Sequence, residues 1–490
     1  MRPGLNGEML ALRYSEIQEV YLSDERPWVV GYSGGKDSTC ALQLIWTALA
    51  ELPREKLTKP VYVISSDTLV ETPVIVRYID TTLERIEAAA HRDGLPFKAQ
   101  KVQPTTEQSF WVNMIGRGYP APSRRFRWCT ERLKIMPADA FIKQRVAEFG
   151  EVIMVLGVRS SESATRAQVM SFHRIKGSPL SRHSSLHNAF VYAPIEAFSV
   201  DDVWTYLLQH PSPWGNDNRD LVAMYKNAQA GECPLVVDKT TPSCGNSRFG
   251  CWVCTVVDRD KSMEAMIDSG EDWLEPLLEF RDLLAETQDP EKKRVYREFR
   301  RKTGRVDFIG DTDAPVPGPY KLEFCKELLR KLLQTQIRVQ KEAPPGEAPI
   351  LIHDSELFEI RRLWRSERGD WADSVPQIVH EVIGRDFDWV AEDAVSYTAE
   401  DARLLAEVCA DHGVPPELVT GLLDIERSSH GLKRRHAVHT RIEELFRQEW
   451  RDLDTLVALR RSELATRQVE AGAPLDGWDQ EEAAIEDGSA

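Results

Sequence analysis

The sequence predicts an α/β fold: a doubly wound, mostly parallel sheet, followed by a cysteine-rich segment and a helical C-terminal region. Apolar runs at residues 28–32, 61–65 and 152–158 are typical of buried strands, and a short polar motif follows each of them. Strands that alternate with helical patterns form a parallel sheet covered on both faces. Ligands of such sheets bind at the carboxyl ends of the strands, where all three polar motifs fall.

The first polar motif is a glycine loop. Its hexapeptide, Ser-Gly-Gly-Lys-Asp-Ser at residues 33–38, stands between the first strand and an amphipathic stretch at residues 39–52. A helix N-terminus offers free amide groups and a positive dipole end to an anion, so this order predicts a phosphate cradle. A Walker A loop needs a longer glycine spacing and Ser or Thr directly after the Lys. Asp37 follows Lys36 here, which excludes that loop, and the full hexapeptide argues against a plain turn.

The composition is that of a soluble globular protein. Hydrophobic residues make up 42% and charged residues 29% of the 490 residues. No apolar run reaches the roughly 20 residues that span a bilayer, and the N-terminus lacks a signal-peptide pattern, so we expect a cytoplasmic protein with no membrane partner. The eight cysteines are then not expected to form a disulfide framework, and any cluster of them indicates metal or redox chemistry. A net charge of −16 argues against binding of nucleic acid by bulk attraction, so any DNA or RNA contact must come from local basic patches or from a partner.

Periodicity and composition divide the chain into segments. We expect an N-terminal helical segment at 1–24, a nucleotide-binding α/β domain at 25–208, a four-cysteine segment at 209–262, a helical extension at 263–342, a linker at 343–349, a helical C-terminal domain at 350–475 and an acidic tail at 476–490. The linker contains Pro-Pro-Gly. The acidic composition of the tail predicts disorder.

Four cysteines with ten, six and two residues between them lie in the loop-rich segment: Cys233, Cys244, Cys251 and Cys254. Zinc and an iron–sulfur cluster both accept four thiolates. Zinc ribbons usually carry two Cys-x-x-Cys pairs, whereas this segment has one. Pro234, Trp252 and Val253 would shield a cluster from water, which favours iron and sulfur. Four unconnected buried thiols are the alternative.

Cys129 lies in the basic segment 124–134. Neighbouring cations are expected to lower the pKa of its thiol and to favour the thiolate. The residue is then a sulfur carrier or a cluster ligand, unless it is a packed thiol beside a solvated basic face. The remaining cysteines lie on helical patterns and fit packed thiols: Cys40, Cys325 and Cys409.

Taken together, these motifs resemble the phosphoadenosine phosphosulfate reductase superfamily, whose members share the PP-loop of the ATP pyrophosphatases. Besides the loop, the matching residues are Asp67-Thr68, Glu71-Thr72, Arg127-Trp128-Cys129-Thr130, Leu133-Lys134, Pro137, Gly157, Arg159, Glu162, Ser163, Arg166, Pro194-Ile195 and Asp202-Val203-Trp204. The resemblance covers roughly residues 25–260. Within the superfamily, the four-cysteine segment and the long helical C-terminus resemble the DndC family of bacterial DNA phosphorothioation. Sulfonucleotide reductases are shorter and end in a catalytic cysteine, which this chain lacks.

The resemblance implies an adenine nucleotide alpha hydrolase-like fold and a set of site residues. ATP with Mg²⁺ would bind at Ser33, Gly34, Gly35, Lys36, Asp37, Ser38, Asp67 and Gly157. Lys36 would neutralise phosphate charge, and Asp37 is the candidate Mg²⁺ ligand. Arg159 and Arg166 would hold phosphate oxygens with two hydrogen bonds each. A 4Fe-4S cluster would bind at the four-cysteine segment.

The implied activity is sulfur insertion into DNA. AMP would be transferred to a non-bridging oxygen of a backbone phosphate with release of pyrophosphate, and sulfur would then displace AMP. The sulfur would come from a cysteine desulfurase, through the cluster or a Cys129 persulfide. A DndD-like ATPase and a DndE-like DNA-binding protein are the further expected partners. tRNA thiolation and sulfonucleotide reduction are enzymatic alternatives, and a zinc-stapled nucleotide-sensing scaffold is the non-enzymatic one.

Three basic stretches could contact DNA, at residues 117–134, 159–187 and 291–305. The first holds six Lys and Arg against one acidic residue, and aromatic residues lie among them. Charge runs are usually solvated faces. The first two stretches adjoin the strand-end motifs, so they are the favoured candidates.

Overall fold

We describe the protein from a computed structural model, which describes residues 5–162, 168, 171–228, 250–301, 303–389, 397–429 and 436–470. The chain forms two compact units. The first consists of Met1–Lys292 with Leu322–Ser396, and the second of Lys293–Lys321 with Tyr397–Ala490. Compactness alone does not show which parts fold by themselves, so the expected domain boundaries stay a prediction.

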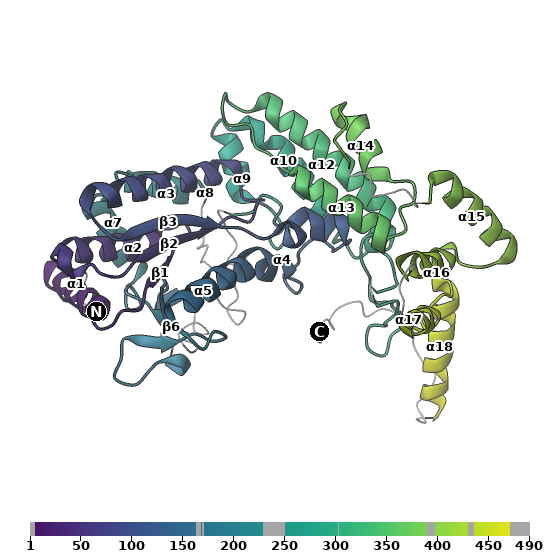
Figure 1. The fold of residues 1–490 in the computed structure, drawn as a ribbon, viewed down its shortest axis with the longest axis horizontal. Coiled ribbons are helices and arrows are strands. Elements are labelled where there is room, and N and C mark those ends of the chain that lie inside the picture. The colour runs from purple at the N-terminus through teal and green to yellow at the C-terminus, as the bar shows by residue number, and fades with distance from the viewer. Residues whose placement is uncertain are drawn as a thin grey trace. The chain divides into compact units, whose positions relative to one another are not determined.

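A six-stranded sheet organises the first unit (Figure 1). Its strands are β1 (Trp28–Gly31), β2 (Val61–Ser66), β3 (Phe97–Val102), β4 (Val152–Val155), β5 (Leu180–Arg182) and β6 (Ala189–Tyr192). The order is β3-β2-β1-β4-β6-β5, and the β5–β6 pair is antiparallel while the other pairs are parallel. This confirms the mostly parallel, doubly wound sheet. The strand order reverses between β1 and β4, which is where ligands bind in such sheets.

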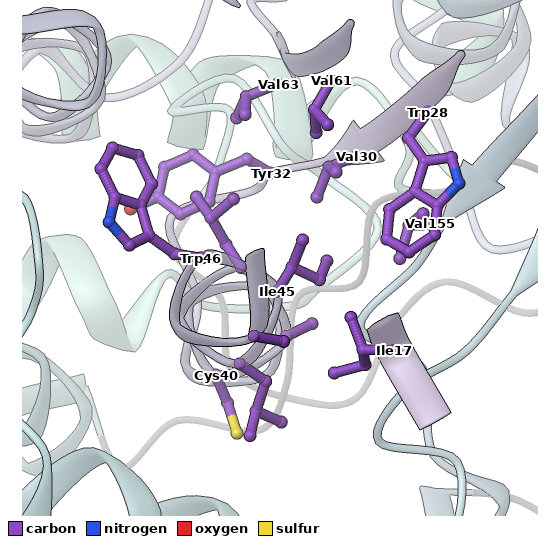
Figure 2. Packing of buried hydrophobic residues seen from close by; sticks show 14 of the residues in the cluster. Ile17, Trp28, Val30, Tyr32, Cys40, Ile45, Trp46, Val61, Val63 and Val155 are labelled. Atoms are coloured by element: carbon purple, nitrogen blue, oxygen red, sulfur yellow. The ribbon is translucent and has the colours of Figure 1, made fainter. Parts of the chain in front are cut away.

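Helices cover both faces of the sheet because strand side chains alternate between the faces. Val30 and Val63 point toward α1 (Gly7–Leu22), α2 (Lys36–Ala50), α3 (Pro73–Asp93) and α7 (Val200–Gln209), where Ile45 packs against them (Figure 2). Val29 belongs to the opposite core cluster with Phe141 of α5 (Met136–Phe149). Figure 1 shows α2 and α3 on one side of the strands and α5 on the other.

Local sequence explains where several of these helices begin and end. The Ser199 side chain and Asp202 form a capping box that starts α7. Pro73 occupies the first turn of α3, and Gly94 ends that helix in the left-handed conformation. Two π-helical turns, Val112–Gly116 and Glu131–Ile135, were not predicted. Such turns are frequent at functional sites, and the second carries Lys134.

Additional helices complete the first unit: α4 (Trp128–Thr130), α8 (Asn218–Ala228), α9 (Lys261–Asp268), α10 (Glu275–Glu286), α12 (Leu322–Glu342), α13 (Asp354–Glu367) and α14 (Ser374–Ile383). Short 3-10 turns lie at Arg54–Lys56, Thr106–Gln108, Ser160–Glu162 and Asp272–Leu274. The Trp364 indole N–H of α13 donates to the Ile115 carbonyl oxygen at 2.8 Å. This buried bond ties the first π-helical turn to the C-terminal helices.

The second unit is helical: α11 (Lys293–Tyr296), α15 (Ala399–His412), α16 (Pro416–Ser429), α17 (His436–Phe446) and α18 (Leu453–Glu470). The Arg300 guanidinium lies 4.4 Å from the centre of the Trp450 ring, so part of the third basic stretch packs inside this unit. No helix among the described residues combines the length and apolarity needed to cross a membrane.

Candidate active site

The glycine loop joins β1 to α2. Gly34 has a φ of +72°, and a Cβ there would collide with the Ile79 side chain of α3, so this position requires glycine. Gly35 is the N-cap of α2 and brings no side-chain cap to the first amides of the helix. The Ser38 hydroxyl donates to the Gly35 carbonyl oxygen at 3.0 Å and lies 3.1 Å from the Ser33 hydroxyl. Loop and helix N-terminus together form a cradle for an anion.

The end of β4 touches this loop at Gly157. A Cβ on Gly157 would lie 2.6 Å from the Asp37 carbonyl oxygen and 2.8 Å from the Ser38 Cα. Backbone cannot move aside as a flexible side chain does, so only glycine fits. The contact brings the motif after β4 directly against the motif after β1.

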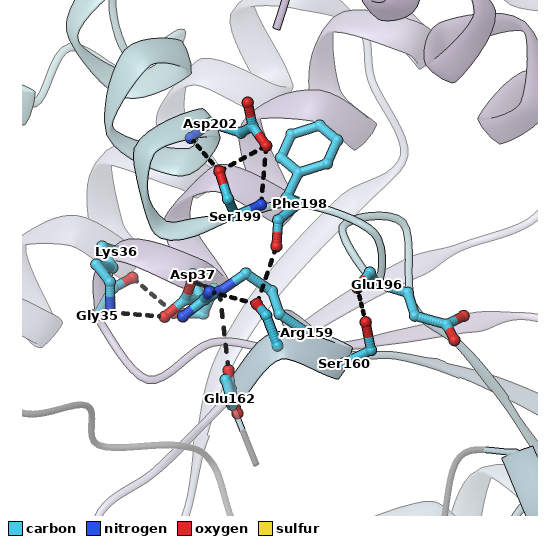
Figure 3. Close-up of polar contacts among 12 residues, drawn as sticks. Gly35, Lys36, Asp37, Arg159, Ser160, Glu162, Glu196, Phe198, Ser199 and Asp202 are labelled. Carbon is cyan, nitrogen blue, oxygen red and sulfur yellow. Dashed lines mark hydrogen bonds and ion pairs between the residues drawn. The ribbon is translucent and has the colours of Figure 1, made fainter. Parts of the chain in front are cut away.

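Asp37 is held between two cations (Figure 3). Its Oδ1 accepts from Nε of Arg159 at 2.7 Å, and its Oδ2 accepts from Nζ of Lys36 at 3.0 Å. Arg159 is 1% exposed and also donates to the Ser161 hydroxyl at 3.1 Å. Glu162 lies 4.0 Å from Nε of Arg159. These residues form one ion-paired network, and their contacts with phosphate stay a prediction.

Tyr225 of α8 lies over the same loop. The Lys36 backbone N–H donates to the Tyr225 hydroxyl at 3.2 Å, and Nζ of Lys36 lies 5.1 Å from the centre of the Tyr225 ring. Trp204 of α7 packs edge-on against that ring, with 5.3 Å between the ring centres. The hydroxyl therefore uses an amide that the anion cradle would offer to a phosphate. Sequence reasoning missed Tyr225 because its helix is distant in the sequence.

A pocket of about 820 Å³, including the part open to solvent, extends from the loop along the ends of β2 and β3. Asp67 accepts the Leu69 N–H at 2.9 Å and a hydrogen bond from Gln103 at 2.9 Å. Lys101 lies 3.2 Å from Asp67 and 2.8 Å from Asp80. The polar lining residues include Ser33, Ser65, Ser66, Asp67, Glu71, Tyr78, Asp80, Lys101, Lys134 and Tyr225.

The cysteine segment forms part of the surroundings of this pocket through Glu71. The backbones of Glu71 and Cys251 pair as an antiparallel bridge. Oε1 of Glu71 accepts from the Thr68 hydroxyl at 3.1 Å, lies 3.4 Å from Nζ of Lys134 and accepts from the Cys251 thiol at 3.7 Å. The Thr68 hydroxyl is also 3.3 Å from that sulfur. One carboxylate thus connects the strand-end motif, the π-helical lysine and a cysteine.

Cys254 lies close to both Cys251 and Cys129. The Cys254 N–H donates to the Cys251 carbonyl oxygen at 3.1 Å, which closes the turn between the two. Burial, the Glu71 carboxylate and Cys254 raise the pKa of the Cys251 thiol well above its usual value, with Lys134 opposing them. Burial and the neighbouring Cys254 raise the pKa of Cys129 to about 11, again against Lys134. The expectation of a lowered pKa is therefore wrong, because desolvation outweighs the cations.

The predicted cluster ligands lie only partly within the described residues. Cys233, Cys244 and Arg166 lie outside the described residues, and within the described ranges no three His, Cys, Asp or Glu side chains form a metal site. Neither Cys251 nor Cys254 forms a disulfide. Two reduced thiols in one tight turn suit thiolate ligation of iron or zinc. The residues present fit a cluster, and the four-cysteine ligand set stays a prediction.

Solved structures with some likeness to this chain have low TM-scores. The phosphoadenylyl-sulfate reductase from Candida auris aligns at 14% identity over 45% of this chain and 93% of that chain, with a TM-score of 0.27. The U34-tRNA thiolase NcsA from Methanococcus maripaludis, with its [4Fe-4S] cluster, aligns at 11% identity over 60% of this chain and 85% of that chain, with a TM-score of 0.27. The fold assignment rests on the sheet itself.

The second compact unit has a family match of its own. Residues 400–447 match the family described as a small protein found in certain Dnd DNA modification systems. The match begins at the second residue of α15 and contains all of α16 and α17 as the structure describes them.

A longer range of residues, in the first unit, matches a second family. Residues 27–256 match the phosphoadenosine phosphosulfate reductase domain. An uncharacterized protein of Methanocaldococcus jannaschii is 28% identical over 249 residues, which are 49% of this chain and 39% of that protein. The chain therefore spans well under half the length of that relative. The matched range begins at β1 and ends just after Cys254, so it contains the glycine loop, the Gly157 contact and the Glu71–Cys251 bridge. Residues 27–256 form a phosphoadenosine phosphosulfate reductase domain.

Proposed function

We propose that this protein is an ATP-dependent sulfurtransferase of DNA phosphorothioation. The observation that carries the proposal is the contact between Glu71, which lines the nucleotide pocket, and the Cys251 thiol. Activation of the DNA phosphate and the sulfur-bearing centre would then lie on the same side of the pocket. The reductase-domain match supports nucleotide-dependent sulfur chemistry, and the Dnd-system match at residues 400–447 supports DNA as the substrate.

In the first half-reaction the loop binds the pyrophosphate part of ATP. The α2 amides and the Lys36 ammonium stabilise the negative charge that develops on the leaving group. A non-bridging oxygen of DNA attacks the α-phosphorus, the bond from that phosphorus to the α–β bridging oxygen breaks, and pyrophosphate leaves. Asp37 would hold the Mg²⁺ that accompanies ATP, in competition with its contacts to Lys36 and Arg159.

In the second half-reaction a sulfur nucleophile attacks the adenylated DNA phosphorus, and the bond to the AMP oxygen breaks. AMP is a far better leaving group than an unactivated oxygen. If the donor is a Cys129 persulfide, the remaining S–S bond takes two electrons from an external dithiol, which becomes a disulfide. A 4Fe-4S cluster on Cys233, Cys244, Cys251 and Cys254 would supply one-electron chemistry beside the same wall.

DNA would approach along the segment that precedes Cys129. Arg124 and Arg125 are exposed there, and Phe126 is 45% exposed between them and Arg127. Exposed arginines around an aromatic ring suit a nucleic acid backbone and its bases. A cysteine desulfurase would supply sulfur, and DndD-like and DndE-like proteins would act on the same DNA.

The test is an anaerobic reaction containing the protein, ATP, Mg²⁺, a cysteine desulfurase with cysteine, a dithiol and either duplex DNA or tRNA. Pyrophosphate is measured directly, and nucleosides and dinucleotides from digested nucleic acid are analysed by mass spectrometry. The proposal expects DNA-dependent pyrophosphate release and phosphorothioate dinucleotides. Thiolated tRNA nucleosides would transfer the function to tRNA, and no pyrophosphate with either nucleic acid would favour the scaffold.

A further inference from the structure

A buried arginine of α10 holds the loop that follows Cys254. Arg281 is 1% exposed. Its Nε donates to the Cys254 carbonyl oxygen at 3.1 Å, Nη1 donates to the Asp258 carbonyl oxygen at 2.9 Å, and Nη2 donates to the Val257 carbonyl oxygen. The loop has no helix or strand of its own between these residues. The planar guanidinium, with five donors in a fixed geometry, therefore determines the path of the backbone here.

Hydrogen bonds from Gln288 and Thr255 connect this loop to the segment before Cys129. The Gln288 side chain, just beyond α10, donates to the Pro122 carbonyl oxygen at 2.8 Å, and the Thr255 hydroxyl donates to the same oxygen at 2.6 Å. Arg281 and Gln288 thus hold the two cysteine-bearing segments against one another.

Few acidic side chains among the described residues offset the positive charge of Arg281. Its ion-pair partner in the described residues is Asp282, whose side chain is 61% exposed, and Asp260 lies within its electrostatic reach. Burying a cation is costly unless hydrogen bonds and opposite charge offset the loss of water. The three carbonyl oxygens supply the hydrogen bonds. Thiolates and the cluster they hold would supply negative charge.

We propose that Arg281 is a positioning residue for the cluster-binding loop. It fixes the turn that carries Cys254 and places a permanent positive charge next to that ligand. This rests on the proposed role of Cys251 and Cys254 as cluster ligands. Two consequences follow: the loop keeps its thiols shielded before metal binds, and the nearby charge favours the more reduced, more negative cluster, which raises its reduction potential.

The experiment compares Arg281→Met and Arg281→Lys with the wild-type full chain. Arg338→Met is the matched control. The exposed Arg338 guanidinium of α12 pairs with Glu279, which lies on α10 like Arg281, and among the described residues it has no contact with the loop. Three quantities are measured: the rate of iodoacetamide labelling of Cys251 and Cys254 in metal-free protein, iron per protein after anaerobic purification, and the midpoint potential.

We expect Arg281→Met to label several-fold faster, to retain less iron and to shift the potential to a more negative value. Arg281→Lys keeps the charge but cannot reach three carbonyls, so it should show fast labelling with a nearly wild-type potential. The control should match wild type in all three. Unchanged labelling in both Arg281 variants would overturn the proposal, and where Arg281→Met does not fold, the Lys variant decides it. A wild-type protein without iron refutes the proposed cluster, whereas the labelling comparison still tests the loop.

Discussion

The Cys251 thiol donates to the Glu71 carboxylate across 3.7 Å, and the backbones of these two residues pair although 180 positions separate them in the sequence. Glu71 lines the pocket beside the glycine loop, so the pairing makes the cysteine segment part of that pocket's surroundings. Lys134 approaches the same carboxylate, which joins the Cys129 helix region to the contact. This arrangement predicts that nucleotide chemistry and sulfur chemistry occur in one active site.

The close approach of β4 to the glycine loop predicts that Gly157→Ala damages nucleotide binding. The added methyl would meet the Asp37 and Ser38 backbone, and such overpacking costs about 1–3 kcal/mol. We expect ATP affinity, measured by calorimetry, to fall about tenfold or more. Gly7→Ala is the control, since nothing lies within 4 Å of its added methyl. Equal ATP affinity in the Gly157 variant and the wild type would contradict this contact as a determinant of the loop.

Replacing the loop cation should separate ATP cleavage from metal content. Lys36→Ala removes the charge that neutralises the leaving pyrophosphate, and we expect pyrophosphate release to fall by about a hundredfold or more. Iron content should stay at the wild-type level, because Lys36 lies on α2 and the four candidate ligand cysteines lie on another segment. ATP cleavage at the wild-type rate would remove the loop from the proposed site.

Asp37 calls for a conservative change. Asp37→Ala would remove the carboxylate that accepts from the buried Arg159 at 2.7 Å, and breaking a buried ion pair destabilises by about 3–5 kcal/mol. Asp37→Asn keeps an oxygen for Arg159 but weakens Mg²⁺ binding. We expect the Asn variant to fold and to require more Mg²⁺ for half-maximal pyrophosphate release, whereas the Ala variant should unfold at lower temperature. An unchanged Mg²⁺ requirement in Asp37→Asn would rule out Asp37 as a metal ligand.

The hydroxyl of Tyr225 should compete with phosphate for the Lys36 amide. Tyr225→Phe frees that amide, and removing one hydrogen bond of about 1 kcal/mol should tighten ATP binding about fivefold. Tyr14→Phe is a suitable control, because that hydroxyl lies 3.4 Å from the Tyr206 hydroxyl and does not line the pocket. Weaker binding in Tyr225→Phe would show that the hydroxyl contacts ATP instead of giving way to it.

Cys129 should react slowly as a free thiol in the metal-free protein. Because the pKa of Cys129 is raised to about 11, the thiolate fraction is small at neutral pH. This fraction rises about tenfold with each unit that the pH is raised, until the pH reaches the pKa. Alkylation of Cys129, followed by peptide mass spectrometry, should therefore accelerate steadily up to about pH 11. A plateau near neutral pH would mean that the cations dominate after all.

The role of Cys129 in sulfur transfer needs a separate variant. Cys129→Ser keeps the shape of the side chain but cannot form a persulfide. A terminal carrier role predicts loss of DNA phosphorothioation with retained cluster absorbance and retained ATP cleavage, whereas a ligand role predicts loss of iron. Full phosphorothioation activity would return Cys129 to a packed thiol.

The paired thiols should be needed for both colour and local stability. Cys251→Ser combined with Cys254→Ser removes two ligands, and metal binding contributes free energy directly to the folding of such segments. We expect the visible absorbance of the anaerobic protein to disappear and the thermal unfolding temperature to fall. Normal colour would place the ligands elsewhere.

Local features of the sequence predicted β1, the loop and α2, because an apolar run, two glycines and an amphipathic stretch each act over a few residues. Long-range contacts determined what was missed. Burial and the sequence-distant Cys254 raise the pKa of Cys129, and Tyr225 reaches the loop from a helix 189 positions away. β3 was also missed, because its four central residues, Lys98–Lys101, are exposed or half-buried and give little apolar pattern.

The most direct measurement counts two products of one reaction. The wild-type protein, ATP, Mg²⁺, duplex DNA and the sulfur-donor system are incubated anaerobically, and pyrophosphate and phosphorothioate linkages are quantified in the same sample at several times. A single active site predicts that every phosphorothioate is accompanied by at least one pyrophosphate, and that Lys36→Ala lowers both products together by about a hundredfold or more. Phosphorothioate formation at the wild-type rate in Lys36→Ala, or without pyrophosphate, would contradict the account.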